Sequence, residues 1–343
     1  MARAGQEDLA RTGCARGLLW SMPSRSSSGP VTSGDRKGMA WVAGGSFLMG
    51  SEDFYPEEQP VHRAAADGFW MDEHPVTVAE FQTFVSATGH VTTAERAPDA
   101  ADYPDASPEQ LVPGSLVFRQ PSRPVPLHDF RAWWAWVPGA QWRHPEGSDC
   151  TTDGLELHPV THVSYSDAQA YAAWAGKSLP TEVEWELAAR GGLDGAVFAW
   201  GDEFAPGGQM MANTWQGDFP LHNEALDGYQ RTSPVATFPP NGFGLYDVAG
   251  NVWEWTDTTY TSHHHAAAGR SERPTTAGAG PCCGPRREHA PPPVDGVAGT
   301  RVIKGGSHLC APNYCLRYRP AARQSQTVDT STSHIGIRCV VRS

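Results

Sequence analysis

The chain has 343 residues, with 26 Lys and Arg against 38 Asp and Glu, so its formal net charge is −12. Because phosphates attract a basic face, this balance argues against nucleic acid or an anionic membrane as a partner. Apolar residues make up 39% of the chain and 13 residues are Trp, which is enough for a sizeable core. The 36 Gly and 29 Pro exclude a helical bundle and predict a globule with many turns.

Residues 1–38 are rich in Ser, Gly and Arg, have no periodicity and predict a disordered extension. They lack the apolar core of a signal peptide, and no stretch reaches the ~18 apolar residues that span a membrane. The seven Cys are odd in number and too sparse for a disulfide scaffold. We therefore expect a cytoplasmic protein with reduced thiols and no membrane contact.

The segment Met39–Met49 predicts a strand, a turn at Gly44-Gly45 and a second strand. Three capping boxes, in which a Ser or Thr precedes a Glu or Asp by three residues, each predict a short helix. These helices are expected to begin after Thr77, Ser164 and Thr181 and to end at Gly89, Gly176 and Gly191.

Residues 92–158 predict an irregular region, whose four Trp either pack in the core or face a ligand. Low complexity over residues 261–299 predicts a mobile loop. Two later runs, Val302–Leu309 and Ile335–Val341, are typical of strands. The chain thus predicts a coil-rich α+β fold with low regular secondary structure, in a single domain over residues 39–343.

Two thiols, Cys310 and Cys315, are separated by four residues and follow Gly305-Gly306, which lets the backbone turn sharply. Three interpretations are open: a structural pair, half of a zinc site without its second cysteine pair, or a redox or soft-metal pair. Two thiolates suit monovalent copper. Guanidinium groups close in sequence would favour thiolates, at Arg317, Arg319 and Arg323.

Side-chain oxygens beside main-chain carbonyls form two further groups. One pairs Asn213 with Asp227, and the other spans Asp247 to Glu254. Hard cations such as calcium take six to eight oxygens from such mixed sources. Solvated turn residues are the alternative, and from these residues alone they are the more frequent case.

Taken in order over residues 40–343, these segments resemble the formylglycine-generating enzyme family, or sulfatase-modifying factors, in its bacterial form. The resemblance is carried by Val42–Gly50, His158–Ser164, Ala175–Glu186, Ala189–Gly192, Ala212–Gly217, Pro240–Tyr246, Gly250–Trp255, Lys304–Ser307, Cys315–Arg319 and Ala321–Arg323. It implies the coil-rich fold of the C-type-lectin-like superfamily. The pair Cys310/Cys315 singles out the formylglycine branch within that fold.

The resemblance implies a copper-dependent oxidase that uses O2 and a thiol reductant. Its substrate would be the cysteine of a Cys-x-Pro-x-Arg motif in an unfolded sulfatase polypeptide, which becomes Cα-formylglycine. By this likeness Cys310 and Cys315 hold Cu(I), and Ser307 completes the catalytic group. The implied substrate-binding residues are Trp253, Tyr314, Arg319 and His334, the last at a position that is often Asn in the family. We expect a monomer.

The family also implies two structural calcium sites. One would use Asn213 and Asp227 with the carbonyls of Thr214 and Tyr229, and the other Asp247 and Glu254 with the carbonyls of Gly250 and Val252. Cys339 matches one half of a disulfide of the secretory-pathway members, but no Cys stands at the partner position. This departure favours a bacterial, cytoplasmic enzyme without structural disulfides.

Two other functions remain open on the same fold. One is a non-catalytic module that binds an extended peptide. The other is an iron-dependent sulfoxide synthase, which needs a His-rich iron site that an added helical domain usually supplies. No such domain fits before residue 39.

Overall fold

The computed structural model describes residues 36–264 and 299–343. The expected extension over residues 1–38 and the expected loop over residues 261–299 therefore lie almost wholly outside the described residues. The helices are α1 (Val78–Thr88), α2 (Tyr165–Trp174) and α3 (Glu182–Arg190), with 3-10 turns at η1 (Pro56–Glu58), η2 (Thr93–Glu95), η3 (Pro108–Gln110), η4 (Phe130–Ala132) and η5 (Pro206–Gly208). None of the helices in the described ranges is both long and apolar enough to cross a membrane.

All three helices begin at their predicted caps. In each, the side chain of the capping Thr or Ser accepts a hydrogen bond from the third helical amide, and the carboxylate there accepts one from the cap. Helices α1 and α3 end at Gly89 and Gly191, whose φ angles of 69° and 57° lie in the left-handed region. Helix α2 is capped by Ala175, one residue before the expected Gly176.

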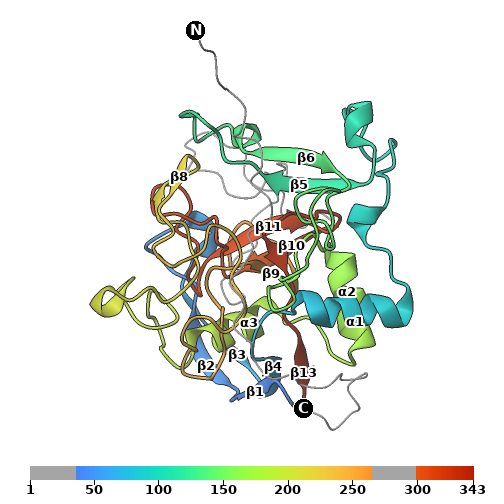
Figure 1. Cartoon of the computed structure of the whole chain (residues 1–343). Helices are drawn as coiled ribbons and strands as arrows, with labels where there is room; N and C mark the ends of the chain where they lie inside the picture. Colours follow the sequence, from blue (N-terminus) through green and yellow to red (C-terminus); the bar gives the residue numbers. More distant parts are fainter. Residues whose placement is uncertain (1–35, 265–298) are drawn as a thin grey trace, which may run out of the picture.

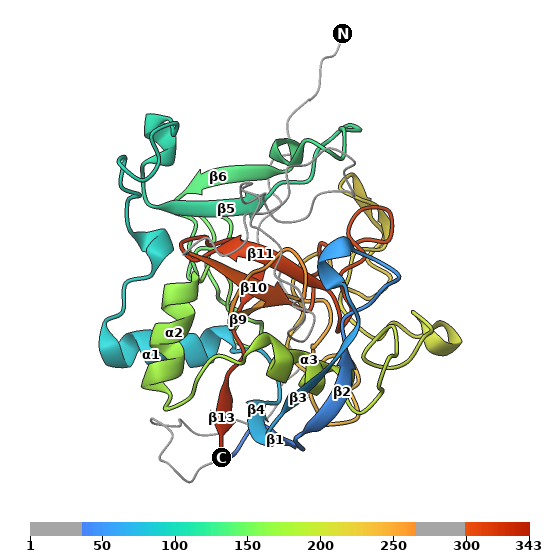
Figure 2. The same cartoon turned by 180° about the vertical axis from the view of Figure 1, so that it is seen from behind.

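The centre of the molecule is a four-stranded sheet in the order β11-β10-β9-β12 (Figure 1). Strand β10 is antiparallel to both neighbours, and β12 runs parallel to β9. Its strands are β9 (Trp253–Thr259), β10 (Thr300–Lys304), β11 (Arg323–Thr327) and β12 (Ile335–Gly336). Figure 2 shows α1 and α2 together beside this sheet, while α3 lies below it and packs on β9 and β10.

The remaining strands form smaller sheets around the centre. A three-stranded sheet has the order β1-β4-β13, and three pairs are β2-β3, β5-β6 and β7-β8. These strands are β1 (Met39–Val42), β2 (Gly45–Met49), β3 (His62–Ala66), β4 (Phe69–Asp72), β5 (Gly114–Phe118), β6 (Trp134–Pro138), β7 (Gly217–Asp218), β8 (His222–Asn223) and β13 (Val340–Arg342). The predicted coil-rich α+β class is therefore confirmed.

Three details of the prediction were wrong. The run Val302–Leu309 is a strand only as far as Lys304, because Gly305 and Gly306 turn the chain away from β10. The other two details concern strand pairing. Residues 92–158 are not wholly irregular, because β5 and β6 pair from Gly114↔Pro138 to Phe118↔Trp134. The run Ile335–Val341 is not one strand but two, since β12 joins the central sheet and β13 joins β4. In both cases tertiary partners decide which residues become strands, as expected for the weak intrinsic preference of β-structure.

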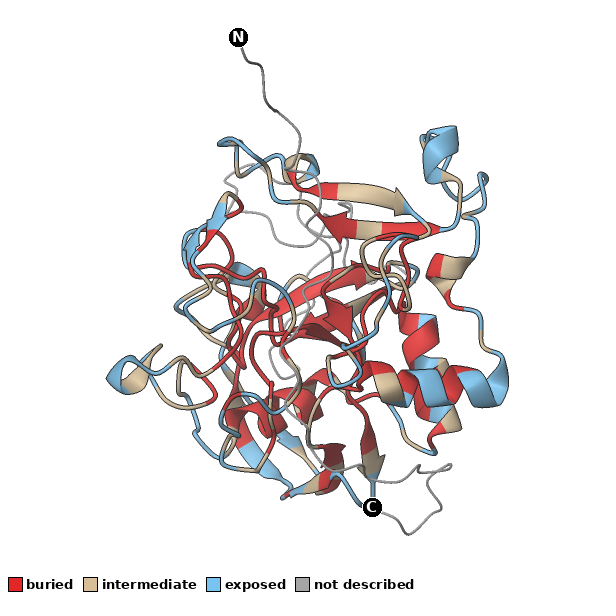
Figure 3. Ribbon diagram, viewed as in Figure 1, coloured by how far each residue is buried: buried red, intermediate tan, exposed pale blue. Residues whose placement is uncertain are grey.

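Buried residues fill the middle of the molecule and exposed ones its periphery (Figure 3). The larger apolar cluster joins α1 and α2 to the central sheet and includes both Cys310 and Cys315. A second cluster lies between α3 and strands β1, β2 and β4. Trp133, Trp134 and Trp142 are buried in the first cluster, so these indoles belong to the core.

Candidate active site

The two predicted thiols lie in the connection between the neighbouring strands β10 and β11 (Figure 1). This connection, residues 305–322, is called the thiol loop below. It leaves β10 through Gly305 and Gly306, with φ angles of 92° and 70°. A Cβ on Gly306 would lie 2.8 Å from the carbonyl oxygen of Arg317, so the two ends of the loop touch through their backbones. Glycine at this position is what allows the loop to close.

The sulfurs of Cys310 and Cys315 are 3.2 Å apart, and both residues are 0% exposed. This separation is well beyond the ~2.05 Å of an S–S bond, so the two residues are thiols. The amide of Ser307 donates to the Cys310 sulfur at 3.4 Å. Trp215 N donates to the Cys310 carbonyl at 3.0 Å, and Cys315 N donates to the Ala311 carbonyl at 2.8 Å. Two neighbouring sulfurs are the soft donor type that monovalent copper prefers.

Ser307 shapes the turn that carries the first thiol. It is fully buried, its carbonyl accepts from Cys310 N at 2.9 Å, and its hydroxyl oxygen accepts from Leu309 N at 3.2 Å. The structure thus brings all three predicted catalytic residues together in one loop.

Three of the four predicted substrate-binding residues lie in the same apolar cluster or beside it. The Tyr314 ring stacks on Phe219, with centroids 4.5 Å apart. Trp253 N donates to the His334 carbonyl at 2.9 Å, so these two residues are adjacent. Both are 0% exposed, and neither Trp253 Nε1 nor His334 Nε2 has a hydrogen-bond partner among residues 36–264 and 299–343.

Buried imidazoles surround this region. Burial lowers the pKa of His334 well below its usual range, and the nearby His308 and His162 lower it further. Burial also lowers the pKa of His308 and of His162 to about 4. All three side chains are therefore neutral near pH 7 and contribute no positive charge there.

The arginines that follow the thiols are held by carboxylates. Arg319 forms a buried bidentate pair with Glu58, at 2.9 and 2.5 Å. Arg317 pairs with Glu57 at 2.5 Å, while Arg323 is bidentate to Glu182. Their positive charge is offset by these partners, so the expected electrostatic support for thiolates is weakened. A peptide would reach the Arg319 guanidinium only by displacing Glu58.

Sequence reasoning missed the segment that holds these arginines, Phe54–Glu58. The Arg317 guanidinium lies 4.0 Å from the centroid of the Tyr55 ring, and that of Arg319 lies 3.6 Å from the Phe54 ring. No sequence signal could have found this segment, because its contacts join residues that lie 261 positions apart along the chain. Burial raises the pKa of Tyr55 to about 12, so its phenol is neutral.

The fold brings the residues of the first expected calcium group together. Asn213 Oδ1 is buried without a hydrogen-bond partner in the described part of the chain. The Asp227 carboxylate accepts from Thr214 N and Tyr229 N, each at 2.9 Å. The Gln216 amide donates to both the Thr214 carbonyl, at 2.5 Å, and Asp227 Oδ2, at 2.8 Å. These donors already occupy oxygens of Asp227 and Thr214, so the unpartnered Asn213 oxygen is the feature that favours a cation here.

The second expected calcium group is more heavily occupied by protein donors. Both oxygens of Glu254 accept from Arg338, and Trp185 Nε1 donates to Oε2 at 2.6 Å. Burial raises the pKa of Asp247, and the charge of Glu254 raises it further. A cation would relieve the repulsion at Asp247 but would share Glu254 with Arg338.

The other cysteines of the described ranges play different parts. Cys339 is a buried thiol, as expected from its missing partner. Cys150 is disulfide-bonded, which differs from the expectation of a chain without structural disulfides.

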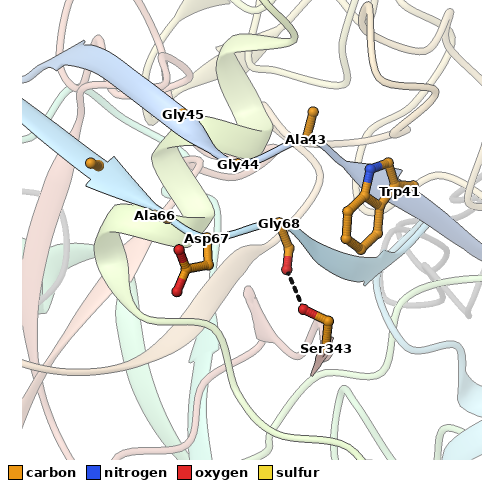
Figure 4. A pocket seen from close by; sticks show the side chains of 9 residues that line it. Trp41, Ala43, Gly44, Gly45, Ala66, Asp67, Gly68 and Ser343 are labelled. Carbon is orange, nitrogen blue, oxygen red and sulfur yellow. Dashed lines mark hydrogen bonds between the residues drawn. The ribbon is translucent and has the colours of Figure 1, made fainter.

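The pocket in Figure 4 lies elsewhere, where the β1–β2 and β3–β4 connections approach each other near the C-terminus. Trp41 and Gly68 line it, and Ser343 Oγ donates to the Gly68 carbonyl at 3.1 Å. None of the predicted site residues lines this pocket.

The fold and the thiol loop together define an α+β protein with a buried dithiol site. A family model described as "Sulfatase-modifying factor enzyme 1-like domain" matches residues 25–343. The formylglycine-generating enzyme of Mycobacterium tuberculosis is 54% identical over 301 residues, which cover 87% of this chain and 96% of that protein. The chain belongs to the sulfatase-modifying factor family.

Two further similarities bear on activity and fold. A Bos taurus protein named inactive Cα-formylglycine-generating enzyme 2 is 42% identical over 311 residues, which cover 89% of this chain and 88% of that one. The solved structure of PvdO from Pseudomonas aeruginosa is similar at 25% identity with a TM-score of 0.55, covering 92% of this chain and 99% of that chain. Relatives of this chain thus include proteins named as active and as inactive, so activity has to be argued from the site.

Proposed function

We propose that this protein is a copper-dependent oxidase that converts the cysteine of a Cys-x-Pro-x-Arg motif in an unfolded sulfatase to Cα-formylglycine. The observation that carries the proposal is the pair Cys310/Cys315, with sulfurs 3.2 Å apart in a buried loop. Its 54% identity to a protein named formylglycine-generating enzyme supports the same reaction.

The electron balance of this reaction requires a reductant. Conversion of the cysteine side chain to an aldehyde with release of hydrogen sulfide removes two electrons, whereas reduction of O2 to water takes four. A thiol reductant would supply the other two. Copper(I), when bound, supplies a soft site for a further sulfur and the means to activate O2.

The roles of the chain's own residues follow from their positions. Cys310 and Cys315 would hold the copper ion, and the Ser307 amide orients the first sulfur by its hydrogen bond. The rings of Trp253 and Tyr314, both buried, would exclude water from the neighbourhood of the pair. His334 is neutral, so it would contact a peptide by hydrogen bonding and not by charge.

The direct test uses copper-loaded protein, a thiol reductant, O2 and a Cys-x-Pro-x-Arg peptide. We expect the peptide to lose sulfur and gain an aldehyde oxygen, as seen by mass spectrometry. Cys310→Ser and Cys315→Ser should abolish the product, whereas Cys339→Ser, which changes a buried cysteine outside the thiol loop, should retain it. No aldehyde from folded, copper-loaded wild type would refute the proposal.

A non-catalytic peptide-binding module is the second candidate, and the similarity to a relative named inactive favours it. It predicts that Cys310→Ser retains full biological effect. Peptide binding by wild type without any turnover would select this candidate over the oxidase.

We further propose that calcium binds at Asn213, Thr214, Asp227 and Tyr229, and at Asp247, Gly250, Val252 and Glu254. The unpartnered Asn213 oxygen supports the first site most directly. Calcium at 100 times its Kd would stabilise the folded state by about 2.7 kcal/mol. We expect a chelator to lower the Tm, calcium to restore it, and Asp227→Asn to remove most of this dependence. A Tm that is indifferent to chelator would contradict both sites.

A further inference from the structure

The second thiol is anchored by a segment that no motif singles out. Leu316, which directly follows Cys315, donates its amide hydrogen to the Tyr55 hydroxyl at 3.0 Å. Cys310, by contrast, is fixed by its own loop and by the Trp215 amide. The two sulfurs are therefore held by different parts of the chain.

The Tyr55 ring is itself held firmly in place. The Arg317 guanidinium lies over its face at 4.0 Å and pairs with Glu57, two residues along from Tyr55. The next residue, Glu58, forms a bidentate ion pair with Arg319. Segment 54–58 thus binds the thiol loop on the C-terminal side of Cys315 through one hydrogen bond and two ion pairs.

We propose that Tyr55 is a positioning residue for the thiol pair: its hydroxyl fixes the main chain after Cys315 and so sets that sulfur against the Cys310 sulfur. The inference rests on the proposed function, because metal binding is what makes the sulfur geometry matter. Without the hydroxyl, the Leu316 amide loses its acceptor and the chain at Cys315 gains freedom.

The test replaces Tyr55 with Phe, which removes only the hydroxyl. We expect Cu(I) affinity, measured by competition with a coloured chelator, to fall about tenfold, as for other groups that orient metal ligands. A metal-free measurement accompanies it: the equilibrium constant for Cys310–Cys315 disulfide formation against glutathione, in which two thiols are oxidised and one glutathione disulfide is reduced. This constant should fall as well, because it reports how closely the sulfurs are held.

Tyr260→Phe is the matched control. Tyr260 is also a buried phenol beneath a guanidinium, that of Arg323 at 5.0 Å, but it lies against the start of β11. Its replacement should leave both constants unchanged. Thermal unfolding of each variant separates loss of positioning from loss of folding.

The outcomes are distinguishable. If Tyr55→Phe lowers the Tm but changes neither constant, Tyr55 is merely structural and the inference is overturned, while the proposed function stands. If wild type binds no Cu(I), the proposed function fails and the disulfide constant still tests the positioning. Should Tyr55→Phe not fold, hydrogen exchange of the Leu316 amide in the wild type tests the same hydrogen bond. An amide that exchanges as fast as an exposed one would overturn the inference.

Discussion

Ion pairs in this protein differ widely in how deeply their side chains are buried. The pair Arg319–Glu58 is buried, with side-chain exposures of 1% and 0%. The pair Arg143–Glu95 has exposures of 41% and 20% and a longer separation of 3.3 Å. Removing one partner of a buried pair leaves an uncompensated charge, whereas exposed pairs contribute little.

Arg319→Gln should therefore lower the free energy of unfolding by about 3–5 kcal/mol, because Glu58 would lose its partner and would have to stay buried as an unpaired carboxylate or take up a proton. Arg143→Gln should cost about 0–1 kcal/mol. Urea unfolding monitored by fluorescence compares the two. Equal losses would mean that the buried pair is no more tightly coupled than the surface one.

At this scale the sequence singled out the two thiols, and the structure places their sulfurs side by side. The calcium oxygens were inferred from the family resemblance, and calcium binding stays a prediction. The sequence did not predict Tyr55 or Glu58. Their partners Leu316 and Arg319 lie 261 residues away along the chain, and no local pattern reports a contact of that separation.

Among the elements, the helices were predictable and several strands were not. Each helix begins with a capping box, which is a local signal in the sequence. Strand β11 has the sequence Arg-Gln-Ser-Gln-Thr, which is polar throughout, and yet four of its five residues are buried. Its pairing with β10, not its own residues, makes it a strand.

Two Thr→Ala changes, one at the N-cap of helix α1 and one in its interior, should differ in their effect on stability. Thr77 caps the helix, so Thr77→Ala should cost about 1 kcal/mol. Thr83 is exposed in the helix interior and its hydroxyl donates back to the Ala79 carbonyl, so Thr83→Ala should be neutral or stabilising. Thermal unfolding of both variants checks this, and a loss of stability in both would count against the capping role.

The molecule as a whole buries several histidines. Burial lowers the pKa of His158, His162, His264 and His308 to about 4. In the unfolded chain these groups titrate near 6.5. Between these values the unfolded state binds more protons, so the stabilisation is complete above pH 6.5 and is lost as the pH falls toward 4.

We therefore expect the free energy of unfolding to fall by up to about 1.4 kcal/mol per pH unit for each such histidine over this window. His162→Gln should flatten the dependence, whereas His222→Gln, at an exposed position, should not. Urea unfolding at several pH values between about 7 and 4 measures the slope. A profile that is flat above about pH 4.5 would contradict the prediction. Burial raises the pKa of Glu186, but the charges of Lys304 and Arg190 outweigh it and hold the pKa at about 2, below its usual 4.5. Glu186 would therefore add acid sensitivity only as the pH falls below about 4.5.

The contact between residues 54–58 and the thiol loop also limits when, during synthesis of the chain, the site can form. A ribosome releases the N-terminal partner of this contact long before it makes residues 316–319, and the central sheet takes β10, β11 and β12 from the last part of the chain. Contacts between such distant segments form late, since a large loop must close first. The sulfur pair is therefore expected to reach its final geometry only after both segments have been made and the central sheet has closed around them.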